Sequence, residues 1–146
     1  MNIDLLKQEL LRYEGYSSVV YLDSLGKPTC GIGHLLRPSD NLQVGIILTP
    51  QQIDSFFQQD IANAVKIVDS LKLNLDEVRY RVLVNLCFNL GNKITQFVHF
   101  LGACRVGDWA TASAQLRSST WFSQVGHRGP ETCYAILNGR YEWESK

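Results

Sequence analysis

The sequence lacks a long apolar run, a cysteine pair and a net charge. Its longest nearly uncharged apolar stretch, residues 82–90, falls far short of the roughly 20 residues that a bilayer span requires. We therefore expect no stable membrane insertion. The 4 cysteines stand far apart without CxxC spacing, which favours reduced thiols. Basic and acidic residues number 14 each, so no basic field collects phosphates and nucleic acid is not expected as a partner.

The N-terminus also lacks a secretory signal. Residues 1–16 alternate charges with leucines, without the basic, apolar and small-residue order of a signal peptide. We therefore expect synthesis in the cytoplasm. Residues 1–78 carry 6 basic and 10 acidic side chains, and residues 79–146 carry 8 and 4, so the second half should attract an anionic polymer more strongly. Nothing in the sequence indicates more than a monomer.

The first half of the chain predicts a helix, a small sheet and a long helix. Apolar residues at helical spacing predict an amphipathic helix over residues 2–12. β-Branched and aromatic residues on either side of a turn at 24–28 predict a β-hairpin or meander over 17–36. Thr49, with a proline and then a glutamine behind it, starts a helix that should continue to about residue 71.

The second half of the chain is predicted to be helical. Asn74 with Glu77 offers a capping pattern before an almost wholly apolar helix over 78–90, which we expect at the buried centre of the domain. Glycines separate the shorter helices expected after it, at about 95–106, 108–117 with Asp108 as cap, 119–124 and 130–138.

These elements predict an α+β fold in a single domain of residues 1–146. One lobe of about residues 13–58 contains the β-region, and the other combines residues 1–12 with 72–146 and is helical. A helix over about 50–71 connects them. Two lobes of this kind are expected to leave a cleft for a ligand.

Several common kinds of site find no support in the sequence. His34, His99 and His127 form no HExxH motif and lie near no CxxC, so no metal is predicted. The serines lack the GxSxG elbow of hydrolases. Residues 31–33 begin like a dinucleotide loop, but Leu36 stands where the third glycine is needed. We therefore expect no cofactor.

Carboxylates are the candidates that remain. Tyr13 and Tyr16 flank Glu14, and apolar surface favours the protonated carboxyl that a glycosidase uses to protonate a leaving oxygen. Asp23 follows the first strand at a polar turn that keeps it ionised. Two carboxyls in different environments are the usual basis of an acid and base pair. Thr29 can direct a hydroxyl to the same place and hold a water. Local context alone also allows both carboxylates to be solvated surface groups.

Short motifs follow one another in a fixed order along nearly the whole chain: Glu14-Gly15, Tyr21-Leu22-Asp23, Gly26, Thr29, GIGHLL at 31–36, the segment 57–60, the segment 85–91, Trp109 and the segment 121–128. Together they resemble the phage-type lysozymes of glycoside hydrolase family 24, in particular those of the T-even type. This resemblance implies a lysozyme-like fold with an active-site cleft between its lobes. It also implies an endolysin that lyses the host cell without a cofactor.

The implied enzyme is a muramidase that hydrolyses the β-1,4 bond between N-acetylmuramic acid and N-acetylglucosamine in bacterial peptidoglycan. The resemblance makes Glu14 the general acid, Asp23 the carboxylate that activates or steadies the attacking water, and Thr29 the residue that positions this water. It also implies an inverting, single-displacement course.

The resemblance assigns further supporting and binding residues. It pairs His34 with Asp60 and places Arg128 near the catalytic helix, although a solvated arginine is equally open at this point. Where similar lysozymes contact their glycan, this sequence has Leu35, Phe88, Asn89 and Gln115. Each of these can instead belong to the core or surface, and Trp109 and Trp121 are expected to pack helices.

Two other functions stay open on the sequence alone. Some relatives that cleave the cell wall are lytic transglycosylases, which release 1,6-anhydro products and need one carboxylate. A non-catalytic peptidoglycan-binding module is the second alternative, and the joint presence of Glu14, Asp23 and Thr29 argues against it. For a protein without a signal peptide, the resemblance also implies a holin, which permeabilises the membrane before the enzyme reaches the wall.

Overall fold

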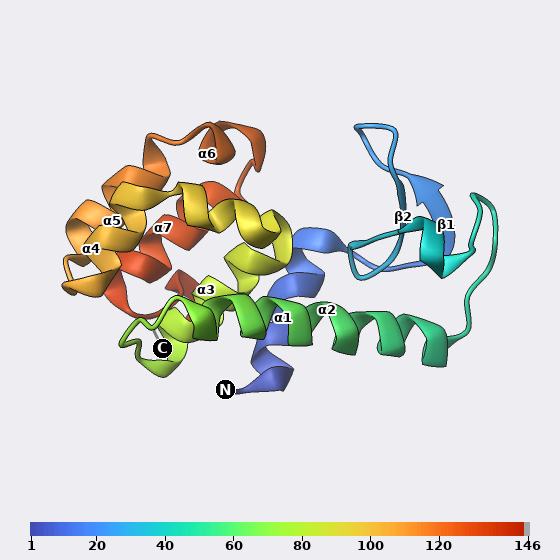
Figure 1. Ribbon diagram of the computed structural model, residues 1–146, viewed down its shortest axis with the longest axis horizontal. Coiled ribbons are helices and arrows are strands. Elements are labelled where there is room, and N and C mark those ends of the chain that lie inside the picture. The colour runs from blue at the N-terminus through green and yellow to red at the C-terminus, as the bar shows by residue number, and fades with distance from the viewer. Residues whose placement is uncertain (145–146) are drawn as a thin grey trace. The chain divides into compact units, whose positions relative to one another are not determined.

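The computed structural model describes residues 1–144 as a mainly helical chain with one small antiparallel sheet (Figure 1). The predicted α+β class is confirmed. The chain divides into two compact units. We call Ile3–Asn63 the β-containing unit, and Met1–Asn2 together with Ala64–Lys146 the helical unit. No helix within residues 1–144 is long and apolar enough to cross a membrane.

Helix α1, Ile3–Glu14, opens the β-containing unit. Leu6 and Leu10 are fully buried, as expected for one apolar face of an amphipathic helix. The helix runs two residues beyond the predicted end at residue 12. It stops where Gly15 adopts a left-handed φ of +70° and donates its N–H to the carbonyl of Leu11 at 3.0 Å. Glu14 is thereby the last helical residue.

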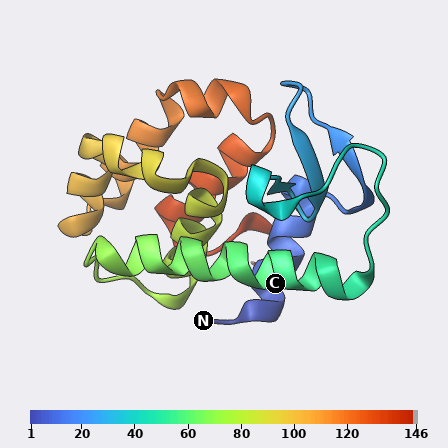
Figure 2. The same cartoon turned by 45° about the vertical axis from the view of Figure 1, so that its right-hand side comes forward.

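Three antiparallel strands form the sheet in the order β1-β2-β3, as the hairpin or meander predicted for 17–36 requires. They are β1, Ser17–Leu22, β2, Pro28–Gly31, and β3, His34–Leu35. Tyr21 lies opposite Thr29 in the register of β1 and β2. The connection that leads to the next long helix runs past β1, where Val19 and Ile47 form an isolated bridge (Figure 2).

A short helix and a long helix complete this unit. Helix η1, Pro38–Asp40, is followed by α2, Pro50–Ser70, which continues into the helical unit. The predicted capping pattern of α2 is confirmed: Gln52 donates its N–H to the Thr49 hydroxyl at 3.2 Å, and the Gln52 side chain accepts the Thr49 N–H at 2.8 Å. The small core beneath the sheet consists of Val20, Cys30, Leu48 and Ile53.

Helix α3, Glu77–Leu90, is the centre of the helical unit. Residues 81–87 are buried without interruption, which confirms the prediction from their apolar character. The predicted cap was wrong: Asp76, not Asn74, accepts the N–H of Arg79 at 3.1 Å. Two capping residues occur within three positions, and the fold selects the one at which the backbone turns into the helix.

The remaining elements are η2, Gly91–Gln96, α4, Val98–Arg105, α5, Trp109–Arg117, α6, Thr120–Gln124, α7, Arg128–Asn138, and η3, Glu142–Glu144. Of these, η2 and α7 pack against α3. The single helix predicted over 95–106 was wrong, because the backbone breaks at Phe97 and separates η2 from α4. The predicted cap at Asp108 is confirmed, and Ser119 caps α6. Helix α7 begins two residues before the predicted Pro130. Figure 1 shows α4, α5 and α7 packed side by side.

Candidate active site

Glu14 lies against the turn between β2 and β3. This turn contains Gly33, whose φ is +59°. A Cβ atom built on Gly33 would lie 2.3 Å from Oε2 and 2.8 Å from Cβ of Glu14. Only glycine fits both this φ and this approach. The glycine pattern around residues 31–33 therefore serves a close contact with a carboxyl group rather than a phosphate.

Asp23 and Thr29 are fixed by the backbone of one residue, Lys27. Oδ1 of Asp23 accepts the N–H groups of Leu25 and Lys27, each at 2.8 Å. The Thr29 hydroxyl donates to the carbonyl of Lys27 at 3.0 Å, and Thr29 is only 7% exposed. Because this bond uses the hydroxyl proton, the Thr29 oxygen can only accept further hydrogen bonds, for example from water. Within the described residues, Oδ2 of Asp23 has no hydrogen-bond partner.

Tyr21 lies within electrostatic range of both carboxylates. Burial raises the pKa of Tyr21, and the negative charges of Glu14 and Asp23 raise it further. In the sheet, Tyr21 lies directly opposite Thr29. The end of α1, the end of β1 and the start of β2 thus bring Glu14, Asp23 and Thr29 into one neighbourhood around Tyr21.

His34 is held between two carboxylates. Its Nδ1 lies 2.6 Å from Oδ2 of Asp60, so the contact implied by the resemblance is confirmed. Its Nε2 lies 3.1 Å from Oδ2 of Asp40. The ring of Phe56 stacks on the imidazole with centroids 4.1 Å apart. Burial lowers the pKa of His34, but hydrogen bonds and charge from Asp60 and Asp40 outweigh it, so the pKa is raised.

Sequence reasoning missed Asp40. Its side chain accepts the N–H of Arg37 at 2.8 Å and closes the turn of η1. A Pro-Ser-Asp turn does predict a local bond of this kind. The contact with His34, six residues earlier, depends on how the chain turns after β3 and has no counterpart in the motifs.

The four cysteines are all buried and free in the structure, and their reduced state stays a prediction. Burial raises the pKa of Cys30 to about 11, with the charges of Asp40 and Asp60 adding to the effect, so the thiol next to Thr29 stays neutral. Among residues 1–144, no group of three or more histidine, cysteine, aspartate or glutamate side chains is arranged to hold a metal ion.

Arg128 is buried in the helical unit, so the alternative of a solvated arginine was wrong. It is 5% exposed, and its Nη2 donates to Oδ1 of Asn85 at 2.7 Å. On the same face of the chain's central helix α3, Asn89 accepts the indole N–H of Trp121 at 2.8 Å. Phe88 is partly buried.

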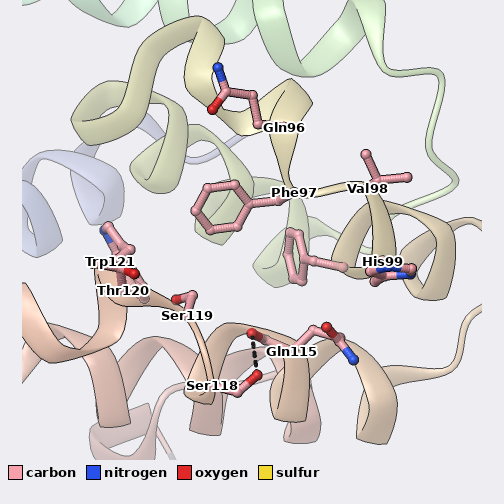
Figure 3. A pocket seen from close by; sticks show the side chains of 10 residues that line it. Gln96, Phe97, Val98, His99, Gln115, Ser118, Ser119, Thr120 and Trp121 are labelled. Atoms are coloured by element: carbon pink, nitrogen blue, oxygen red, sulfur yellow. Dashed lines mark hydrogen bonds between the residues drawn. The ribbon is translucent and has the colours of Figure 1, made fainter.

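Gln115 and Trp121 line a pocket of about 370 Å³ in the helical unit (Figure 3). One wall comes from the end of η2 and the start of α4, and the other from α5 and α6. The ring of Phe97 points into the pocket, and the hydroxyl of Ser118 donates to the carbonyl of Gln115 at 3.2 Å. Leu35, on β3 of the other unit, is 49% exposed.

Comparison with known proteins identifies the family. The model of the family described as phage lysozyme matches residues 11–140 of this chain. The chain belongs to the phage lysozyme family. It is therefore a glycoside hydrolase of the lysozyme type, and the substrate class of its family is peptidoglycan.

Individual relatives agree with this assignment. Probable T4-type lysozyme 1 of Dictyostelium discoideum is 26% identical over 159 aligned positions, which cover 90% of this chain and 94% of that protein. An endolysin of Acyrthosiphon pisum secondary endosymbiont phage 1 is 30% identical over 120 positions, with 82% and 80% covered. The pre-baseplate central spike protein Gp5 of Enterobacteria phage T4 is 27% identical. There the match covers 94% of this chain but 28% of that longer protein. This chain is thus similar to T4-type lysozymes.

Proposed function

We propose that this phage lysozyme is an endolysin-type muramidase that hydrolyses the β-1,4 bond between N-acetylmuramic acid and N-acetylglucosamine. One observation carries the assignment of its catalytic residues. Asp23 and Thr29 both bond to the backbone of Lys27, Thr29 pairs across the sheet with Tyr21, and the charges of Glu14 and Asp23 both raise the pKa of Tyr21. Two carboxyl groups and a hydroxyl in one neighbourhood are the groups that an acid-catalysed attack of water on a glycosidic bond requires.

In the proposed reaction, Glu14 donates its proton to the glycosidic oxygen as the bond breaks through an oxocarbenium-like transition state. A water on the opposite face of the sugar donates one hydrogen bond to Asp23 Oδ2 and one to the hydroxyl oxygen of Thr29. Asp23 takes up the proton as the water attacks, and the anomeric configuration is inverted. The bonds from Leu25 and Lys27 keep the Asp23 carboxylate in a fixed orientation for this step.

The other residues named by the resemblance receive supporting roles in this proposal. Leu35, Phe88, Asn89 and Gln115 are proposed to contact the glycan, and the bond of Asn89 to Trp121 supports this role by fixing the amide. Arg128, His34 and Asp60 are proposed to support the catalytic residues. We further propose that the protein acts as a monomer and as one domain. A holin would admit it to the wall.

Mass spectrometry of the soluble products from purified peptidoglycan tests the proposal. Muropeptides with free reducing N-acetylmuramic ends, absent when E14Q replaces the wild-type protein, are the expected result. Proton NMR of the fresh products should show the α-anomer first, because inversion of a β-bond gives it. Products with 1,6-anhydro ends would identify a lytic transglycosylase instead. Tight wall binding by a folded protein without any products would identify a binding module.

A further inference from the structure

We propose that Asp40 is a positioning residue for the reaction, because it helps to hold His34 as an imidazolium that fixes Gly33 against Glu14. This inference rests on the proposed function of Glu14 as the acid. It concerns a carboxylate that has no role in the proposed mechanism above. Its evidence is the geometry on the two sides of the Gly33–His34 peptide.

The first observation is that both ring nitrogens of His34 face carboxylate oxygens. Nδ1 lies 2.6 Å from Asp60 and Nε2 lies 3.1 Å from Asp40. A neutral imidazole has one N–H group and one lone pair, so one of these contacts would set a lone pair against a carboxylate oxygen. Only the imidazolium donates to both. His34 is 2% exposed, so water cannot take over either contact.

The charged groups that face the His34 ring favour the imidazolium. From α2, Asp60 faces the ring, and from η1, Asp40 does. In β2, Cys30 stays neutral, because its pKa is raised to about 11 by burial. Arg37 contributes a backbone N–H to Asp40 and a guanidinium bond to the side chain of Gln59 at 2.9 Å.

Arg37 and His34 also affect the pKa of Asp40. Burial raises the pKa of Asp40, but the Arg37 N–H and His34 outweigh this effect and lower it. Asp40 therefore keeps its charge across the pH range in which His34 gains or loses its proton. Removing the proton of His34 would leave two carboxylates facing a neutral ring in a buried place, and the contact with η1 would weaken.

The second observation connects this cluster to Glu14. Gly33 directly precedes His34, and the planar peptide between them passes movement of one residue to the other. On its far side, Gly33 approaches Glu14 so closely that a Cβ atom would lie 2.3 Å from Oε2. The imidazolium thus bonds the turn between β2 and β3 to Asp60 of α2 and Asp40 of η1. On its other side, the same turn confines the carboxyl group of Glu14.

The first experiment needs no variant. In an NMR pH titration of the wild-type protein, the amide of Gly33 and the side-chain carboxyl of Glu14 should both report a transition at the pH where the His34 ring titrates. If the Gly33 amide does not respond while His34 loses its proton, the proposed connection is wrong. This readout does not depend on catalytic activity.

The second experiment compares D40N with D54N on peptidoglycan across the pH range. Asp54 is exposed near the start of α2, so D54N removes one charge from the same unit without touching His34. We expect D40N to move the alkaline limb of kcat to lower pH. On that limb kcat should fall about three- to tenfold, since a nearby opposite charge shifts a histidine titration by roughly a unit. Near pH 5, D40N should match the wild-type protein, and D40E should restore part of the limb.

The outcomes separate this inference from the proposed function. A D40N profile that is lowered equally at all pH values, or that matches D54N, overturns the role of Asp40 while an inactive E14Q still supports the role of Glu14. If instead E14Q retains activity, the proposed function fails. The NMR titration then still decides whether the charge of His34 is connected to Gly33.

Discussion

Gly33 packs so tightly against Glu14 that the side chain of alanine has no room between them. A Cβ atom on residue 33 would lie 2.3 Å from Oε2 of Glu14, and the φ of Gly33 is +59°. The backbone of another element therefore confines the carboxyl group that α1 places at its end. This arrangement makes the glycine a sensitive test of the site.

G33A should reduce both activity and stability. The left-handed φ alone costs about 1–2 kcal/mol for a residue with a Cβ, and the clash must displace Glu14. The matched control is G107A, because Gly107 has a left-handed φ of +70° but a Cβ there meets nothing within 4 Å among the described residues. Urea unfolding and kcat on peptidoglycan should show similar backbone costs in both variants, with a large loss of kcat in G33A alone. Equal kcat in the two variants would contradict the account.

Replacing Thr29 should separate its hydroxyl from its shape. T29V keeps the volume but removes the oxygen that is proposed to accept from water, whereas T29S keeps that oxygen. We expect T29V to lose about ten- to hundredfold in kcat with little change in KM, since a lost hydrogen bond in the transition state costs about 1.5–3 kcal/mol. Steady-state kinetics on soluble glycan fragments measure both constants. A T29S variant as slow as T29V would show that the hydroxyl has no such role.

The contribution of the pair of His34 and Asp60 to stability should disappear at alkaline pH. The hydrogen bonds and charges of Asp60 and Asp40 raise the folded-state pKa of His34 above its ordinary 6.5, against the opposing effect of burial. The stabilisation is then complete below pH 6.5 and is lost as the pH rises through the raised folded-state value. D60N should therefore cost about 1–3 kcal/mol at pH 5.5 and progressively less toward pH 9.

Urea unfolding of D60N, D54N and the wild-type protein at several pH values measures this dependence. The deficit of D54N should not vary with the titration of His34, because Asp54 lies outside the cluster. A D60N deficit that stays constant or grows from pH 6 to pH 9 would refute the role of the imidazolium.

Arg81 provides a test of stability in the helical unit. It is 1% exposed and pairs with Glu77 and, at 2.6 Å, with Glu144 of η3. E144Q should destabilise the protein by about 1–3 kcal/mol, because it leaves part of a buried charge uncompensated. R81M fills the same space without a charge and should cost less than R81A, which leaves a cavity. Denaturant unfolding in which E144Q equals the wild-type protein, or R81M equals R81A, would contradict this description.

The sequence alone predicted those elements and site residues whose contacts lie within a few positions along the chain. Asp23 and Thr29 lie on either side of one turn, so the hairpin alone brings them together, and Thr49 with Gln52 caps α2 within four residues. A motif therefore predicts them as well as a structure does.

Contacts that depend on how the chain folds back could not be predicted in this way. Asp40 meets His34 only because the chain after β3 folds back, and the charge of Arg81 in an apolar helix is explained by Glu144, 63 residues later. The break at Phe97 has no glycine or proline to announce it, because packing against other helices decides it.

The most direct test of the central claim is the initial rate of peptidoglycan solubilisation by E14Q beside D4N and the wild-type protein. Asp4 is exposed in the first turn of the same helix, so D4N removes a charge from α1 far from its end. Circular dichroism confirms that both variants are folded. The account predicts that D4N keeps the wild-type rate and that E14Q loses about 10²–10⁴-fold, the usual contribution of a general acid. An E14Q rate within about threefold of wild type would contradict it, because that is far below such a contribution.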